Sequence, residues 1–119
     1  RTYVTIGTKI YHNPGCSKSR QTLALLESKG LKPVIVEYLK EGLDSETLAS
    51  LLRLLGVDDG SILRKKEDAY AASGLNDTST NDEIIAQIVA QPILLERPIV
   101  VKGSKAVIGR PPENINELL

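Results

Sequence analysis

The sequence predicts an α/β domain in which a mixed sheet carries helices on its faces. A strand–helix–strand pattern opens the chain, and a strand–strand–helix pattern closes it. Between them, over about residues 43–92, leucine and isoleucine recur at helical spacing. At 119 residues the chain is long enough for one core, so we expect one domain over residues 1–119 with residues 1–7 as an N-terminal lead.

The first pattern is a strand, a turn, a helix and a second strand. Residues 8–12 ("TKIYH") predict the first strand, "NPG" predicts the turn, and residues 17–30 predict a helix that Gly30 ends. The apolar face of this helix consists of Leu23, Leu25 and Leu26. Residues 32–39 ("KPVIVEYL") have the continuous β-branched content of a buried strand, which fits a parallel neighbour.

The middle of the chain begins with a second helix over residues 43–56, which Asp44 or Ser45 caps and Gly56 ends. Its buried stripe consists of Leu48, Leu51, Leu52 and Leu55. The stretch that follows, to about residue 76, contains short helical pieces among charged residues.

The last third starts at Thr80, which forms a capping box with Glu83 at the start of a helix that Pro92 closes. The buried face of that helix consists of Ile84, Ile85, Ile88 and Val89. The strands "PIVV" and "KAVIG" flank Gly103-Ser104, a hairpin signature, and "PPENINELL" predicts a final helix with proline in its first turn. This order is the layout of a thioredoxin-like domain that carries a helical insertion.

Composition excludes several functional classes. Fifteen basic residues balance fifteen acidic ones, whereas nucleic-acid-binding domains normally show a basic excess. No apolar run approaches the ~20 residues that span a bilayer, and "RTYVTIGTK" lacks the layout of a secretory signal. The single cysteine excludes an internal disulfide, which fits a reducing compartment. We therefore expect a cytoplasmic protein with no nucleic-acid or membrane partner.

The one cysteine and the one histidine, Cys16 and His12, both lie in "YHNPGCSKSR". A lone cysteine is usually a small buried hydrophobe, but Cys16 lies where a strand turns into a helix. The N–H groups of the first helical turn favour a thiolate there. Ser19 is placed to donate a hydroxyl hydrogen bond to the thiolate, and His12 to stabilise it or to accept the thiol proton. We predict a reactive Cys16, with His12 and Ser19 as catalytic partners.

The spacing around Cys16 limits its chemistry. Cys16 to Ser19 is a C-x-x-S pattern, so an external thiol must reset Cys16 after it is oxidised or covalently loaded. The phosphatase-type loop carries arginine six positions after its cysteine, and that position is Thr22 here. One cysteine and one histidine do not make a credible metal site. We expect no bound metal and no bound cofactor.

Taken together, the motifs resemble one known family. "IYHNPGCSKSRQTL", "ERPIVV" and "IGRPPE", in this order, are similar to motifs of the glutaredoxin-linked arsenate reductases, which have a thioredoxin-like fold with a helical insertion. The resemblance extends from about Lys9 to Leu119. It implies that Cys16 is the catalytic cysteine of the motif H-N-P-x-C-x-x-S, with His12 and Ser19 beside it.

The resemblance also implies three oxyanion-binding arginines, Arg64 in "LRKK", Arg97 in "ERPIV" and Arg110 in "GRPPE", and a cis peptide at Arg97-Pro98. The implied reaction is reduction of arsenate to arsenite, with glutathione as reducing co-substrate and glutaredoxin for regeneration. Guanidinium groups suit this role, because their fixed fork of donors matches an oxyanion better than a lysine point charge does.

Two other interpretations remain open at the level of the sequence. One is a thiol-dependent reductase of the same fold that acts on another substrate. The other is a regulator similar to the Spx transcription regulators, which bind RNA polymerase and typically carry a C-x-x-C redox switch. Ser19 in place of a second cysteine, together with Arg110 at the last oxyanion position, favours the enzyme.

Overall fold

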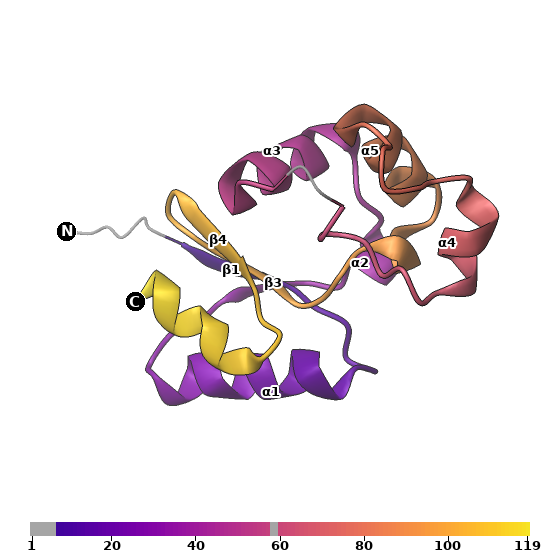
Figure 1. Ribbon diagram of the computed structural model, residues 1–119. Coiled ribbons are helices and arrows are strands. Elements are labelled where there is room, and N and C mark those ends of the chain that lie inside the picture. The colour runs from indigo at the N-terminus through magenta and orange to yellow at the C-terminus, as the bar shows by residue number, and fades with distance from the viewer. Residues whose placement is uncertain (1–6, 58–59) are drawn as a thin grey trace. The chain divides into compact units, whose positions relative to one another are not determined.

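A computed structural model describes residues 7–57 and 60–119 (Figure 1). The predicted N-terminal lead, except for Gly7, lies outside the described residues. The chain forms two compact units: one contains the residues up to Tyr38 together with Arg97–Leu119, and the other is Leu39–Glu96. The second unit thus occupies the place in the sequence of the predicted helical insertion. The single domain over residues 1–119 stays a prediction.

The first unit is built on a mixed four-stranded sheet, as the sequence predicts. Its strands are β1 (Thr8–Tyr11), β2 (Val34–Val36), β3 (Ile99–Lys102) and β4 (Lys105–Ile108). Their order in the sheet is β2-β1-β3-β4, with β1 and β2 parallel and the other two pairs antiparallel. The parallel pair requires a crossover connection, which is the helix that follows β1.

Two helices pack on this sheet, α1 (Ser17–Ser28) and the 3-10 helix η3 (Pro112–Leu118), and they contact each other (Figure 1). Ile10 of β1 lies opposite Val100 of β3, and both side chains are fully buried. The core cluster consists of Ile10, Leu26, Val100, Ile115 and Leu118, with Leu23, Leu25, Leu31 and Val107 packed against it. The leucine face predicted for α1 therefore faces the core, and the final helix is 3-10 rather than α.

The second strand differs from its prediction. β2 is parallel to β1, but Val34 and Ile35 are 59% and 44% exposed. The prediction of a buried strand is wrong because β2 lies at the edge of the sheet, with a partner on one side only. A continuous β-branched run is typical of buried parallel strands, yet the run alone does not show whether helices cover both faces.

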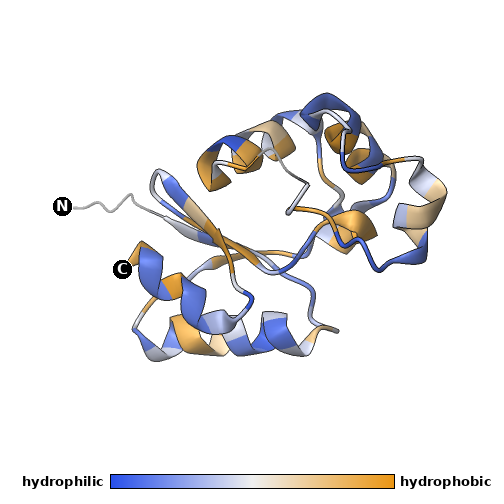
Figure 2. Ribbon diagram, in the orientation of Figure 1, coloured by the Kyte–Doolittle hydropathy of each residue, from blue (hydrophilic) through white to orange (hydrophobic). Residues whose placement is uncertain are grey.

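The hairpin between β3 and β4 forms at the predicted turn. Gly103 has φ +62°, in the left-handed region that a residue at this turn position needs, and β4 begins at Lys105. The tip of the hairpin is hydrophilic, whereas the strand that leads into it is apolar (Figure 2). The start of β3 is accordingly buried, and the residues of the turn are exposed to solvent.

The second unit is helical. Its elements are α2 (Tyr38–Glu41), which begins in the last residue of the first unit, then α3 (Ser45–Leu55), α4 (Asp68–Ser73), α5 (Asn81–Ala90) and the 3-10 helix η2 (Pro92–Leu94). α5 contacts both α3 and η2. The fully buried apolar side chains of this unit include Leu48, Ile62, Ile84, Ile88, Leu94 and Leu95.

The helix ends of the second unit follow the predicted signals. Asp44 caps α3 by accepting a hydrogen bond from the Thr47 N–H at 2.8 Å, and Gly56 ends it at φ +69°. Thr80 and Glu83 form the predicted capping box on α5. The predicted buried face of α5 is too wide, since Val89 is 41% exposed. Among the described residues, no helix is both long enough and apolar enough to cross a membrane.

Candidate active site around Cys16

The loop from β1 to α1 is a turn built by Asn13. The Asn13 carbonyl accepts a hydrogen bond from the Cys16 N–H at 3.0 Å, and its side-chain Oδ1 accepts one from the Gly15 N–H at 2.9 Å. Pro14 presets the turn, and Arg20 donates to the Pro14 carbonyl at 2.7 Å. The turn therefore places Cys16 at the N-cap of α1, with φ −102° and ψ 124°.

His12 and Ser19 are paired with each other. The Ser19 Oγ lies 2.6 Å from His12 Nδ1 and accepts a hydrogen bond from the Asn13 N–H at 3.0 Å. Ser19 is fully buried and His12 is 6% exposed. The Ser19 hydroxyl oxygen has two lone pairs, so it accepts from the Asn13 N–H and still hydrogen-bonds His12 Nδ1, with the direction of that bond set by the histidine tautomer.

This pairing defines the surroundings of both residues, whose catalytic roles stay a prediction. Burial lowers the pKa of His12, the charge of Glu37 opposes that effect, and the charge of Arg20 adds to it; the net direction is down. His12 is therefore neutral near pH 7. The Ser19 hydroxyl, expected to reach the thiolate, instead bonds His12, and together the two side chains hold the start of α1 against the end of β1.

The pKa of Cys16 is lowered overall. Burial is the largest single influence and raises it, but the Ser19 N–H, the charge of Arg97, the Lys18 N–H and the Arg110 guanidinium together outweigh burial. Ser19 thus acts on the thiolate through its backbone. The sulfur makes no side-chain cap hydrogen bond within the described residues, and α1 has no acidic residue in its first turn. The N–H groups at this helix start are therefore available to a thiolate.

Two of the three predicted arginines lie with Cys16 in the first unit. Arg110 Nη1 lies 3.8 Å from the Cys16 Sγ and donates to the Arg97 carbonyl at 3.2 Å. The charge of Arg97 also acts on the thiolate. Cys16 is half-buried and Arg110 is exposed, so an anion from solvent has access to a thiolate with positive charge beside it.

The peptide bond Arg97-Pro98 is cis, as the resemblance implies, and so is Arg110-Pro111, which the sequence did not predict. Each arginine of the site therefore precedes a cis-proline. The two loops are tied together by the Gly109 N–H, which donates to the Pro98 carbonyl at 2.8 Å.

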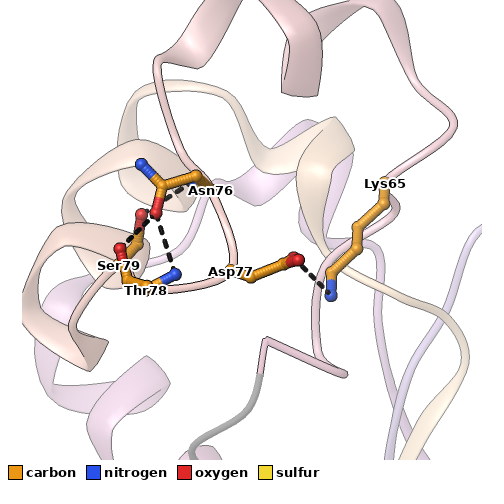
Figure 3. Close-up of polar contacts among 5 residues, drawn as sticks. All are labelled: Lys65, Asn76, Asp77, Thr78 and Ser79. Carbon is orange, nitrogen blue, oxygen red and sulfur yellow. Dashed lines mark hydrogen bonds and ion pairs between the residues drawn. The ribbon is translucent and has the colours of Figure 1, made fainter.

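The third predicted arginine, Arg64, lies in the second unit. Its Nη2 forms an ion pair with Glu67 at 2.8 Å, and its N–H donates to the Leu94 carbonyl at 2.8 Å. The next residue, Lys65, lies 3.9 Å from Asp77 (Figure 3). The structure therefore gives Arg64 a partner within its own unit, and its predicted role as an oxyanion ligand stays a prediction.

The turn that carries Asp77 is closed by Asn76. Its Oδ1 accepts hydrogen bonds from the Thr78 N–H at 2.8 Å and the Thr78 hydroxyl at 2.6 Å, and its N–H donates to the Ser79 Oγ at 2.9 Å (Figure 3). These bonds are local and exposed, so they explain the path of the chain into α5 rather than a binding site.

Sequence reasoning missed Asn13, Thr22 and Gly109. Asn before Pro-Gly is a turn signal, so the role of Asn13 was readable from "NPG". Thr22 and Gly109 meet across 87 positions of sequence, at 3.1 Å between hydroxyl and carbonyl, and no local pattern indicates that contact. Among the described residues, no group of three or more His, Cys, Asp or Glu side chains is arranged to hold a metal ion.

Comparison with known proteins adds a family and a fold. The profile of the ArsC family matches residues 11–118. The chain is 48% identical over 118 residues to "Uncharacterized protein YfgD" of Escherichia coli (strain K12), covering 98% of this chain and 99% of that one. It is 46% identical to the arsenate reductase of Haemophilus influenzae, covering 92% of this chain and 97% of that one. A solved structure, the arsenate reductase from Vibrio cholerae, superposes with a TM-score of 0.91 at 41% identity, covering 96% of this chain and 98% of that one.

Proposed function

This chain belongs to the ArsC family, and on that premise we propose that it reduces arsenate to arsenite with Cys16 as the nucleophile. The observation that carries the proposal is the half-buried Cys16, whose pKa is lowered and whose sulfur lies 3.8 Å from Arg110. Relatives named arsenate reductases, at 46% and 43% identity over more than nine-tenths of this chain, support the same substrate.

The two arginines solve an electrostatic problem. Arsenate is an anion at neutral pH, and a thiolate repels it. Arg97 and Arg110 offset that repulsion, and their donors stabilise the charge that moves as sulfur attacks arsenic. Arg64 is proposed as a third oxyanion ligand on the resemblance alone.

The first step forms a bond between the Cys16 sulfur and arsenic, while an arsenic–oxygen bond breaks and its oxygen leaves as water after taking up protons. Glutathione then bonds to the Cys16 sulfur, and the electron pair of the sulfur–arsenic bond stays on arsenic. Arsenic gains two electrons and leaves as arsenite, and the two thiols become a mixed disulfide. Glutaredoxin attacks that disulfide and restores the Cys16 thiolate.

In this scheme His12 and Ser19 position the nucleophile. The hydrogen bond between the Ser19 hydroxyl and His12 Nδ1 holds the start of α1 in place, which keeps the Ser19 N–H directed at the sulfur. The electrons come from outside the chain, as they must in a protein with one cysteine. A reducing cytoplasm, where glutathione and glutaredoxin act, is the compartment we propose.

The test is a coupled assay with arsenate, glutathione and glutaredoxin that follows oxidation of the glutathione pool. We expect arsenate-dependent turnover that Cys16→Ser abolishes and that Ser17→Ala, a change at the exposed neighbour, leaves intact. A Cys16→Ser variant that still reduces arsenate contradicts the mechanism. A wild-type protein with a reactive Cys16 and no arsenate turnover contradicts the substrate and favours a thiol reductase that acts on another oxidant.

A further inference from the structure

Thr22 lies in α1, six residues after Cys16, and its side chain is fully buried. Its hydroxyl lies 2.8 Å from the Lys18 carbonyl in its own helix and 3.1 Å from the Gly109 carbonyl. A bond to the carbonyl four residues back is common for threonine in helices. The second acceptor is not local: it belongs to the segment between β4 and η3, and the single hydroxyl proton is shared between the two carbonyls.

Gly109 packs so closely against Thr22 that a side chain at position 109 would have no room. A Cβ built on Gly109 would lie 2.8 Å from the Thr22 Oγ1, 2.9 Å from the Thr22 Cγ2 and 3.0 Å from the Pro98 Cγ. The φ of Gly109 lies outside the left-handed region, so the glycine is needed for space rather than for its backbone angle. Its N–H donates to the Pro98 carbonyl at 2.8 Å.

The contact joins the three segments that make the site. Gly109 precedes Arg110, Pro98 follows Arg97, and Thr22 lies in the helix that Cys16 begins. Arg110 in turn reaches the Cys16 sulfur and the Arg97 carbonyl. A shift of the Gly109 backbone away from α1 therefore moves both arginine-bearing loops relative to the sulfur.

We propose that Thr22 and Gly109 are positioning residues that hold the Arg110 loop, and through it the Arg97 loop, against the helix that carries Cys16. The proposal rests on the function proposed above only in that the arginines bind the substrate oxyanion. The effect on the thiol itself requires no particular substrate. Neither residue touches the reacting atoms, so their influence passes through Arg110.

The experiment compares Thr22→Val, which keeps the shape and removes the hydroxyl, with Thr22→Ser, which keeps the hydroxyl. Each is made alone and combined with Arg110→Ala, and Gly109→Ala tests the junction from its other side. The first readout is the apparent pKa of Cys16 in alkylation by iodoacetamide. The second is the pair KM and kcat for arsenate, and thermal melting reports on folding.

We expect Thr22→Val to raise the apparent pKa of Cys16 toward the value of Arg110→Ala, because Arg110 lowers it in the native protein. In the Arg110→Ala background the same change should add nothing. The KM for arsenate should rise about two- to tenfold, which corresponds to the loss of one typical hydrogen bond, and kcat should change less. Thr22→Ser should keep the pKa of Cys16 and the KM for arsenate close to their wild-type values. Gly109→Ala should raise both quantities more than Thr22→Val does.

A folded Thr22→Val that leaves the pKa unchanged, or that shifts it equally with and without Arg110, overturns the proposal and leaves Thr22 a packing residue. If Thr22→Val does not fold, Gly109→Ala decides the question by the same comparison of backgrounds. If the alkylation results hold while no arsenate is reduced, the positioning role stands and the proposed substrate fails.

Discussion

Helices α1 and α5 begin in two different ways. At α5, the Thr80 hydroxyl accepts a hydrogen bond from the Glu83 N–H at 3.2 Å, and the Glu83 carboxylate accepts one from the Thr80 N–H at 2.8 Å. Asp82 adds a second acid to that first turn. At α1 the N-cap is Cys16, and the first turn of this fully described helix contains no acid and no side-chain cap.

The difference shows that the unpaired N–H groups of a helix N-terminus can either stabilise the helix or favour a bound anion. Every helix start leaves backbone N–H groups without helical partners and carries partial positive charge. At α5 neutral and acidic oxygens satisfy these groups, which stabilises the helix. At α1 the groups remain for a sulfur atom, and they are well satisfied only when that sulfur is a thiolate. The arginines beside Cys16 also attract an incoming anion.

The largest effect is expected from removing the positive charge of an arginine beside Cys16. Arg97→Ala should lower kcat/KM for arsenate by about 10- to 100-fold, because a hydrogen bond to a charged group contributes about 1.5–3 kcal/mol. Cys16 should still be alkylated. Steady-state kinetics with Arg53→Ala, an exposed arginine of α3, as the control measures the effect. Equal loss of alkylation and arsenate use would instead indicate a folding defect.

A smaller effect is expected at the other helix start. Thr80→Ala removes half of the capping box and should lower the free energy of unfolding by about 1 kcal/mol. Denaturant unfolding measures the loss. The same variant should leave the apparent pKa of Cys16 where it was, and a change there would mean that the two helix starts are not independent.

An acidic residue in the first turn of α1 would make its start resemble that of α5. Ser17 is the first residue of α1, and Ser17→Glu places an acid in its first turn. The pKa of Cys16 should rise by about 0.2–0.7, since a charge at a helix terminus contributes about 0.3–1 kcal/mol and one pH unit corresponds to 1.36 kcal/mol. Alkylation rates against pH give the value. Ser17→Gln, of equal size and no charge, should match the wild type.

The smallest effect is on stability against pH. Because the pKa of Cys16 is lower in the folded protein than in the unfolded chain, its contribution is fully present above pH about 8.5 and is lost as the pH falls through the folded value. The free energy of unfolding of the wild type minus that of Cys16→Ser should therefore grow between pH 7 and pH 8.5. A flat or falling difference would contradict a stabilised thiolate.

Features set by neighbouring residues could be predicted from the sequence. The spacing of Thr80 and Glu83 places both partners of the capping box on one turn, and Gly103 supplies a backbone angle that few other residues adopt. The position of Cys16 between a turn and an amphipathic segment predicted its place at a helix start. In each case the physical cause lies within about four residues.

Features set by packing could not be predicted in this way. The run 34–36 is equally apolar at an edge and in the middle of a sheet, so the exposure of β2 depends on what covers it. The sequence indicated only the thiolate as partner of the Ser19 hydroxyl, whereas the buried contact with His12 follows from packing. The approach of Arg110 to Cys16 spans 94 positions and came only from the resemblance.

The most direct test of the account is the rate of Cys16 alkylation measured against pH in the wild-type protein. The chain has one cysteine, so the signal belongs to Cys16 alone. We predict a single titration with an apparent pKa below that of a free thiol, about 8.5, and a rise when Arg110 is changed to alanine. An apparent pKa at or above 8.5 in the wild type would contradict the claim that this helix start and its arginines maintain a reactive thiolate.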